Sequence, residues 1–77
     1  MAIPVLLELS RYLLRALVGR PGEARVEHLH SGGVDFLFFE VAGPDEKNLS
    51  ERDKEALASV VERIGKKLGH EVIVDWR

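Results

Sequence analysis

Cysteine is absent from this chain of 77 residues, which excludes a disulfide framework, thiolate catalysis and cysteine-based zinc sites. No apolar run approaches the roughly 20 residues that a membrane-spanning helix needs. The apolar stretch from Met1 to Leu9 has no basic start and is interrupted by Glu8, so it lacks the pattern of a signal peptide. These absences favour a reducing compartment, a cytoplasmic location and no membrane partner.

A strong excess of charge is also lacking, because 11 basic and 13 acidic residues give a net charge of -2 with neutral histidines. Residues 1–26 carry four arginines and two glutamates, or +2, whereas residues 27–77 carry the other 7 basic and 11 acidic residues, or -4. Proteins that bind nucleic acid mainly by neutralising phosphates are strongly basic. Any nucleic-acid binding is therefore expected to be weak or confined to a local patch.

Motifs of catalysis are missing too, since the chain has no phosphate-cradling glycine loop, nucleophile elbow or dinucleotide fingerprint. Acid–base catalysis needs carboxylates that converge in a cleft, but the acidic residues here fall in predicted loops or on outer helix faces. These are Glu40, Asp45, Glu46, Glu51, Asp53, Glu55, Glu62 and Asp75. We therefore expect no enzymatic activity and no cofactor.

Two amphipathic helices are predicted, over Pro4–Val18 and Ser50–Leu68. Proline suits the first turn of the first helix, and Ser50 is a good N-cap for the second, which Gly69 ends. Apolar residues at helical spacing form one stripe on each helix. The stripes consist of Leu6, Leu9, Leu13, Leu14 and Leu17, and of Leu57, Val60, Val61, Ile64 and Leu68.

Three strands are predicted between and after these helices, over Ala24–His30, Val34–Val41 and Glu71–Trp76. A loop of Ser31, Gly32 and Gly33 joins the first two strands, so they should form an antiparallel hairpin with the first strand at the sheet edge. A short helical turn is expected over Glu46–Leu49. The order is helix, strand, strand, short helix, helix, strand.

The strand over Val34–Val41 should be central, because it is apolar on both faces. Phe36 and Phe38 point to one side, and Leu37, Phe39 and Val41 to the other. The helices can cover only one face, so the second is either shielded by long side chains or serves as a docking surface. Candidate protein contacts are therefore Phe36, Phe38 and Trp76, or Arg11 and Arg15, which share one face of the first helix.

Three histidines raise the question of a metal site. His28 and His30 share a face of the first strand, and His70 beside the last strand could complete a set of three nitrogen ligands. No spacing in the sequence brings His70 near the other two, and such pairs on edge strands are commonly plain surface residues. We therefore predict no metal site.

The element order and the length resemble the type II KH domain, most closely the small stand-alone bacterial KH-domain proteins. The matching segments are a leucine-rich helix ending in a Pro-Gly turn (Leu6 to Gly22), a hairpin (Ala24 to Val41), an acidic Pro-Asp-Glu-Lys stretch (Pro44 to Lys47), an Ala-Leu helix (Ser50 to Leu68) and a terminal Gly-His-Glu-Val-Ile-Val. Together these segments cover nearly the whole chain.

In that family, a GxxG loop between two adjacent helices lets backbone amides approach the nucleic-acid backbone, and nearby apolar groups accept bases. Both glycines are missing here, and acidic residues enter the corresponding stretch from Asn48 to Lys54. The residues that the resemblance places nearest a bound strand are Lys47, Ser50, Arg52 and Lys54.

The sequence thus predicts one α+β domain over residues 1–77, KH type II-like, with a three-stranded sheet and helices on one face. The first functional hypothesis is a degenerate KH-like module that binds single-stranded RNA weakly. The second is a module for protein interaction or self-association, for example as a dimer, that has lost nucleic-acid binding.

Overall fold

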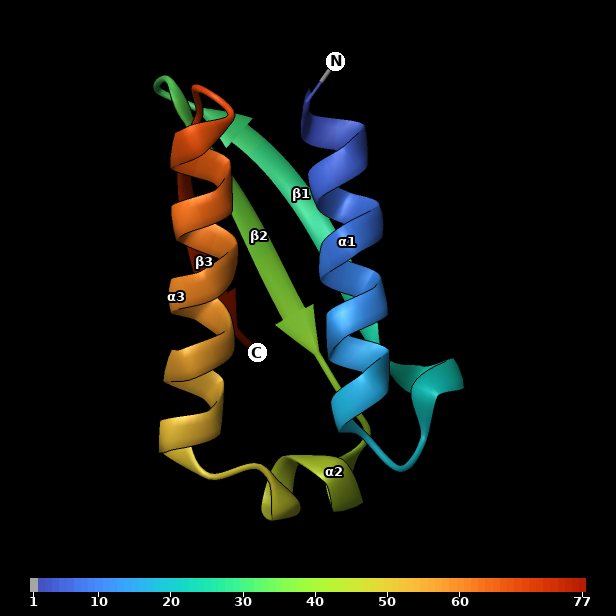
Figure 1. Ribbon diagram of the computed structural model, residues 1–77. Coiled ribbons are helices and arrows are strands. Elements are labelled where there is room, and N and C mark those ends of the chain that lie inside the picture. Colours follow the sequence, from blue (N-terminus) through green and yellow to red (C-terminus); the bar gives the residue numbers. More distant parts are fainter. Residues whose placement is uncertain (1) are drawn as a thin grey trace.

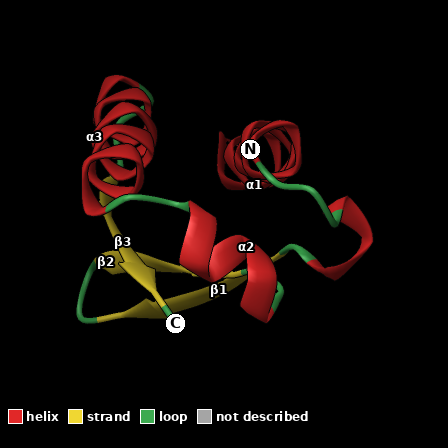
Figure 2. Cartoon of the chain, turned by 90° about the horizontal axis from the view of Figure 1, so that it is seen from below, coloured by secondary structure: helices red, strands yellow, loops and turns green. Residues whose placement is uncertain are grey.

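The computed structural model describes residues 2–77 and has the predicted α+β architecture. Its elements are α1 (Ala2–Leu17), a 3₁₀ turn η1 (Pro21–Glu23), β1 (Arg25–Ser31), β2 (Val34–Glu40), α2 (Gly43–Asn48), α3 (Glu51–Lys67) and β3 (Glu71–Trp76). Helices α1 and α3 lie antiparallel in one layer over the sheet, and α2 lies at one end of it (Figures 1 and 2). No helix in residues 2–77 combines the length and apolarity that crossing a membrane requires.

The sheet has the order β1-β2-β3, which confirms that β1 is an edge strand and β2 is central. β1 pairs with β2 in an antiparallel hairpin, whose turn residues Gly32 and Gly33 have φ of 59° and 78°. Two successive positive φ values are typical of the two-residue hairpin turn and favour glycine. β3 pairs with β2 in parallel, so the sheet is mixed.

The helices cover the face of β2 that carries Leu37 and Phe39, both of which have no exposed surface. Leu37 and Phe39 belong to the same buried core cluster as Leu14 of α1 and Val61 of α3. The alternate residues of β2, among them Phe36, lie on the opposite face, which no helix covers. The open face of the sheet is therefore the one that carries the pair of phenylalanines.

The predicted ends of α3 are confirmed by their hydrogen bonds. The Ser50 Oγ accepts from the Asp53 amide at 3.0 Å, as an N-cap does. Gly69 has a φ of 88°, and the His70 amide donates to the Gly65 carbonyl, which closes the C-terminal turn.

The buried side of α3 differs from the predicted stripe. Lys54 and Gly65 are buried beside Leu57 and Val61, whereas Val60 is 48% exposed. Leu68 and, on α1, Leu17 were also expected in the stripes but are exposed. The physical reason is the direction of contact: α3 packs on β3 as well as on α1, so its buried side is turned away from Val60.

Two residues of α3 fix its contact with β3. A Cβ added to Gly65 would lie 2.4 Å from Cγ2 of Val72, so only glycine permits this close approach. The Glu62 carboxylate, expected on the outer face, instead accepts a hydrogen bond from the Val74 amide at 2.8 Å. This bond occupies a donor on the edge strand β3, which would otherwise be open to pairing with another chain.

Candidate functional site

The corner between α2 and α3 is the place where the KH resemblance puts a nucleic-acid contact. Only Leu49 and Ser50 separate the two helices, so no flexible glycine loop lies between them. Ser50 is exposed, but its hydroxyl is already engaged as the N-cap of α3. Glu51 and Asp53 place carboxylates in the first turn, where they stabilise the helix and repel a phosphate.

Lys54 was predicted to lie near a bound strand, but its side chain is only 9% exposed. Its Nζ pairs with the Glu46 carboxylate and lies 3.8 Å from that of Glu51, and the hydrogen bond to Glu46 is the main cause of a raised Lys54 pKa. The Trp76 indole donates to the Lys54 carbonyl at 3.2 Å, and the lysine Nζ lies 5.8 Å from the ring centroid. Lys54 therefore holds the corner together and is not available to a ligand.

Two of the four predicted nucleic-acid contacts remain accessible. Lys47 lies in the last turn of α2 and Arg52 in the first turn of α3, and both are exposed and form no ion pair with another described residue. Asp45, expected in a solvated loop, is instead buried, and its carboxylate accepts from the Gly19 and Arg20 amides at 2.8 and 3.0 Å. The corner thus offers two exposed cations, and Asp45 ties α2 to the residues that follow α1.

The open face of the sheet carries an apolar row formed by one residue from each strand: Leu29, Phe36 and Ile73. The Phe36 and Phe38 rings stack with centroids 6.3 Å apart, and the Arg77 guanidinium lies 4.3 Å from the Phe38 ring centroid. Aromatic rings with a neighbouring arginine can accept bases or protein side chains. Acidic side chains on the same face of the flanking strands, Glu27, Glu71 and Asp75, disfavour an approaching phosphate backbone.

Trp76 was predicted to share this face with the phenylalanines, and that grouping was wrong. Trp76 pairs with Phe39 in the sheet register and therefore points to the helix-covered side. The two rings meet edge to face with centroids 5.2 Å apart. The indole is part of the support beneath α3, so it is not a contact on the open face.

The three histidines come together around a residue that the sequence analysis did not single out, Asp35. The Nε2 of His28 and the Nδ1 of His30 lie 2.7 and 2.9 Å from its Oδ1, and the Nδ1 of His70 lies 3.3 Å from its Oδ2. The Asp35 side chain is only 5% exposed. The hydrogen bond from His28 lowers the pKa of the Asp35 carboxyl, burial opposes this shift, and His30 reinforces it.

In this cluster, the imidazole rings of His28, His30 and His70 surround the carboxylate of Asp35. An ionised carboxylate only accepts, so the nearest nitrogens of His28 and His30 carry their hydrogens toward it and offer no lone pair there. Within residues 2–77 no set of three such side chains is arranged to hold a metal ion. The cluster ties the β1–β2 hairpin to the start of β3. One contact of this cluster was predictable from the sequence, because the two-residue hairpin turn pairs Asp35 with His30 across the two strands.

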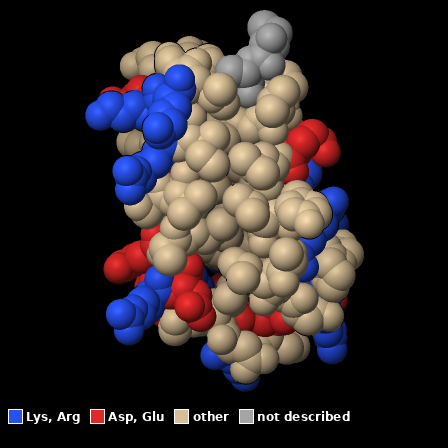
Figure 3. Space-filling model, viewed as in Figure 1, with Lys and Arg blue, Asp and Glu red and all other residues tan. Residues whose placement is uncertain are grey.

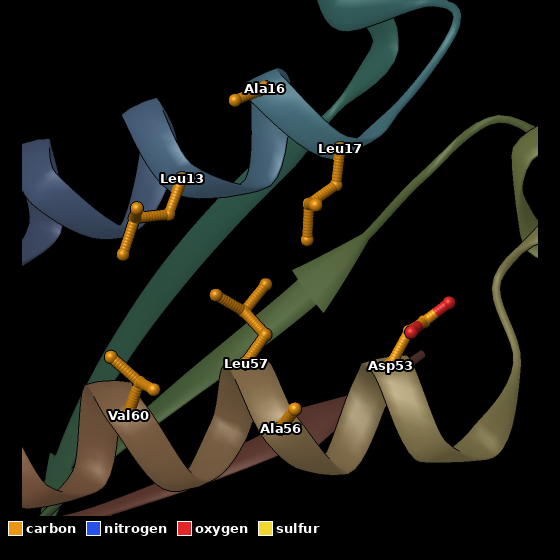
Figure 4. A pocket seen from close by; sticks show the side chains of 7 residues that line it. All are labelled: Leu13, Ala16, Leu17, Asp53, Ala56, Leu57 and Val60. Carbon is orange, nitrogen blue, oxygen red and sulfur yellow. The ribbon is translucent and has the colours of Figure 1, made fainter.

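A groove of about 320 Å³ lies between α1 and α3. Its lining residues are Leu13, Ala16, Leu17, Asp53, Ala56, Leu57 and Val60, of which only Asp53 is charged (Figure 4). Arg11 and Arg15, predicted as candidate protein contacts, differ in their surroundings. Arg11 pairs with Glu8 at 2.8 Å, whereas Arg15 is exposed and makes no ion pair with another described residue.

The chain has no detectable similarity to known proteins: no protein-family model matches it, and neither do curated proteins or solved structures. The likeness to KH domains therefore depends on its sequence pattern and element order alone.

Proposed function

We propose that this chain is a KH-like, non-enzymatic module that binds single-stranded RNA weakly at the corner between α2 and α3. The observation that carries the proposal is the element order: a central strand, β2, leads into two short-linked helices, and a last strand returns parallel to it. This is the order on which the KH resemblance was based, and by that resemblance Lys47 and Arg52 are the candidates for the family's backbone contact.

The charge at the corner determines how strong this binding can be. Lys47 and Arg52 supply two phosphate contacts, while the neighbouring Glu51 and Asp53 repel the strand. Two contacts on a single strand give a logarithmic salt slope of about -1.4, from about -0.7 for each phosphate. Raising the salt from 50 to 200 mM should then weaken binding by roughly sevenfold, far less than for a basic RNA-binding protein.

Fluorescence anisotropy with a labelled single-stranded RNA of mixed sequence tests this proposal. The variants Lys47→Glu and Arg52→Glu should each weaken binding, and a double-stranded RNA should bind less well than the single strand. Lys66→Glu, at the exposed far end of α3, is a control of equal charge change that should leave the affinity within about twofold. Equal losses for all three variants would show that only net charge matters and would reject a site at the corner.

The second candidate is the protein-interaction role. It is favoured by a separate observation, because uncharged side chains cover the middle of the face formed by α1 and α3 (Figure 3).

A further inference from the structure

The outer surface of the helical layer carries more large apolar side chains than a helix surface in contact with water normally does. Four of the exposed large apolar residues lie on α1 and α3: Val5, Tyr12, Leu17 and Val60. Tyr12 is 72% and Val5 is 64% exposed, and their spacing of seven residues puts them on one side of α1. A helix that covers a sheet normally presents polar residues to water on this side.

The uncharged surface is continuous, as Figure 3 shows. Uncharged side chains cover the middle of the face formed by α1 and α3, and charged side chains gather at its margins. The groove between the helices lies in this region, and small residues on both sides of it, Ala16 and Ala56, leave room for close packing. An apolar centre with a charged rim is the arrangement of a protein interface.

Each helix carries an acidic residue toward its start and basic residues toward its end. Because the helices run antiparallel, the two charge patterns are reversed relative to each other in space. Helix α1 carries Glu8 in its first half and Arg15 near its end, whereas α3 carries Asp53 near its start and Arg63 and Lys67 toward its end. The two helices run antiparallel in one chain (Figure 1). Laying α1 of one copy antiparallel on α3 of another therefore brings Glu8 toward Arg63 and Arg15 toward Asp53.

We propose that a second copy of this chain covers the helical face, with α1 of each copy packed antiparallel on α3 of the other. A two-fold axis parallel to the helices generates both contacts at once, so the assembly closes as a dimer and every charge pair occurs twice. Tyr12 enters the groove region of the partner, where Ala56 and Val60 lie. Of the residues that the proposed RNA site invokes, this interface uses Asp53 alone, and neither Lys47 nor Arg52 forms one of its charge pairs.

The mass in solution, measured by sedimentation without nucleic acid, tests the dimer independently of RNA binding. The wild-type mass should rise with concentration from 8.6 kDa toward twice that value. Glu8→Arg and Arg63→Glu should each raise the dissociation constant of the dimer by about tenfold, because each reversal disrupts two symmetric charge pairs. Glu8→Arg also removes the exposed pair with Arg11 within each chain, so Arg63→Glu is the cleaner of the two variants. The double variant Glu8→Arg/Arg63→Glu restores opposite charges and should recover most of the affinity.

A control on the other face separates this interface from one on the sheet. Leu29→Asp puts a charge on the open sheet face and should leave the wild-type dissociation constant unchanged, with circular dichroism confirming that each variant is folded. A mass of 8.6 kDa up to millimolar concentration would overturn the proposal and leave the face to a different protein. A dimer that Leu29→Asp disrupts, or one that the double charge reversal does not restore, would also overturn it.

Discussion

The Nε2–H of His28 donates a hydrogen bond to the Oδ1 of Asp35 over 2.7 Å, and this contact joins the two strands of the hairpin on the helix-covered side. The carboxylate is nearly inaccessible to water, so the histidines replace the hydrogen bonds that burial removed. Asp35 is thus a buried charge whose partners come from β1 and from the turn before β3. Replacing Asp35 should therefore lower the free energy of unfolding more than it changes any binding reaction.

Asp35→Asn should destabilise the fold at neutral pH by about 1–3 kcal/mol, since the charge-assisted bonds to His28 and His30 are lost. The folded-state pKa of Asp35 is lowered, so its contribution is fully present above the unfolded pKa, about 3.9, and disappears as the pH falls through the lower folded value. The difference between the two proteins in urea unfolding should therefore narrow below about pH 4. A difference that stays constant down to pH 2 would contradict this account.

Gly65→Ala should destabilise the fold by about 1–3 kcal/mol, although alanine favours a helix over glycine by about 1 kcal/mol. The added methyl group would clash with Val72 and force α3 away from β3. Gly43→Ala is the matched control, because nothing lies within 4 Å of its added Cβ and its position is also helical. Thermal unfolding should give a lower midpoint for Gly65→Ala alone, and equal midpoints for the two variants would contradict the close approach.

Ser10→Ala should leave the fold equally stable or raise its free energy of unfolding by up to about 1 kcal/mol. The Ser10 hydroxyl is fully buried in α1 and has no hydrogen-bond partner among the described residues. Removing an unpaired buried hydroxyl relieves a desolvation cost, and alanine is the better helix former. Chemical denaturation checks this, and a loss above 1 kcal/mol would mean that the hydroxyl makes a bond that the structure does not show.

Local patterns in the sequence were sufficient to predict the elements and the sheet edge. The two glycines at Gly32 and Gly33 predicted the hairpin, Ser50 predicted the start of α3, and the strand apolar on both faces was correctly predicted to be central. Each of these depends on residues close in the chain. The predicted fold class was therefore confirmed, and the ends of α1 and α3 lie within two residues of the prediction, whereas α2 begins three residues earlier than predicted, at Gly43.

Contacts between distant elements were not predictable in the same way. Apolar spacing ranks Val60 above Lys54 as a buried residue, but the position of α3 over β3 buries the lysine, whose charge Glu46 balances. Alternation alone put Trp76 on a face with the phenylalanines, because relative facing depends on the parallel register of β3. That same register brings His70 to Asp35, a contact that the sequence gives no sign of.

The measurement that tests the central claim most directly is a two-dimensional amide NMR titration of the wild-type chain with a short single-stranded RNA, at 50 and 200 mM salt. RNA binding at the corner predicts shifts that cluster from Lys47 to Arg52 and weaken as the salt rises. Shifts confined to the open sheet face around Phe36, or no shifts at either salt, would contradict the proposed site.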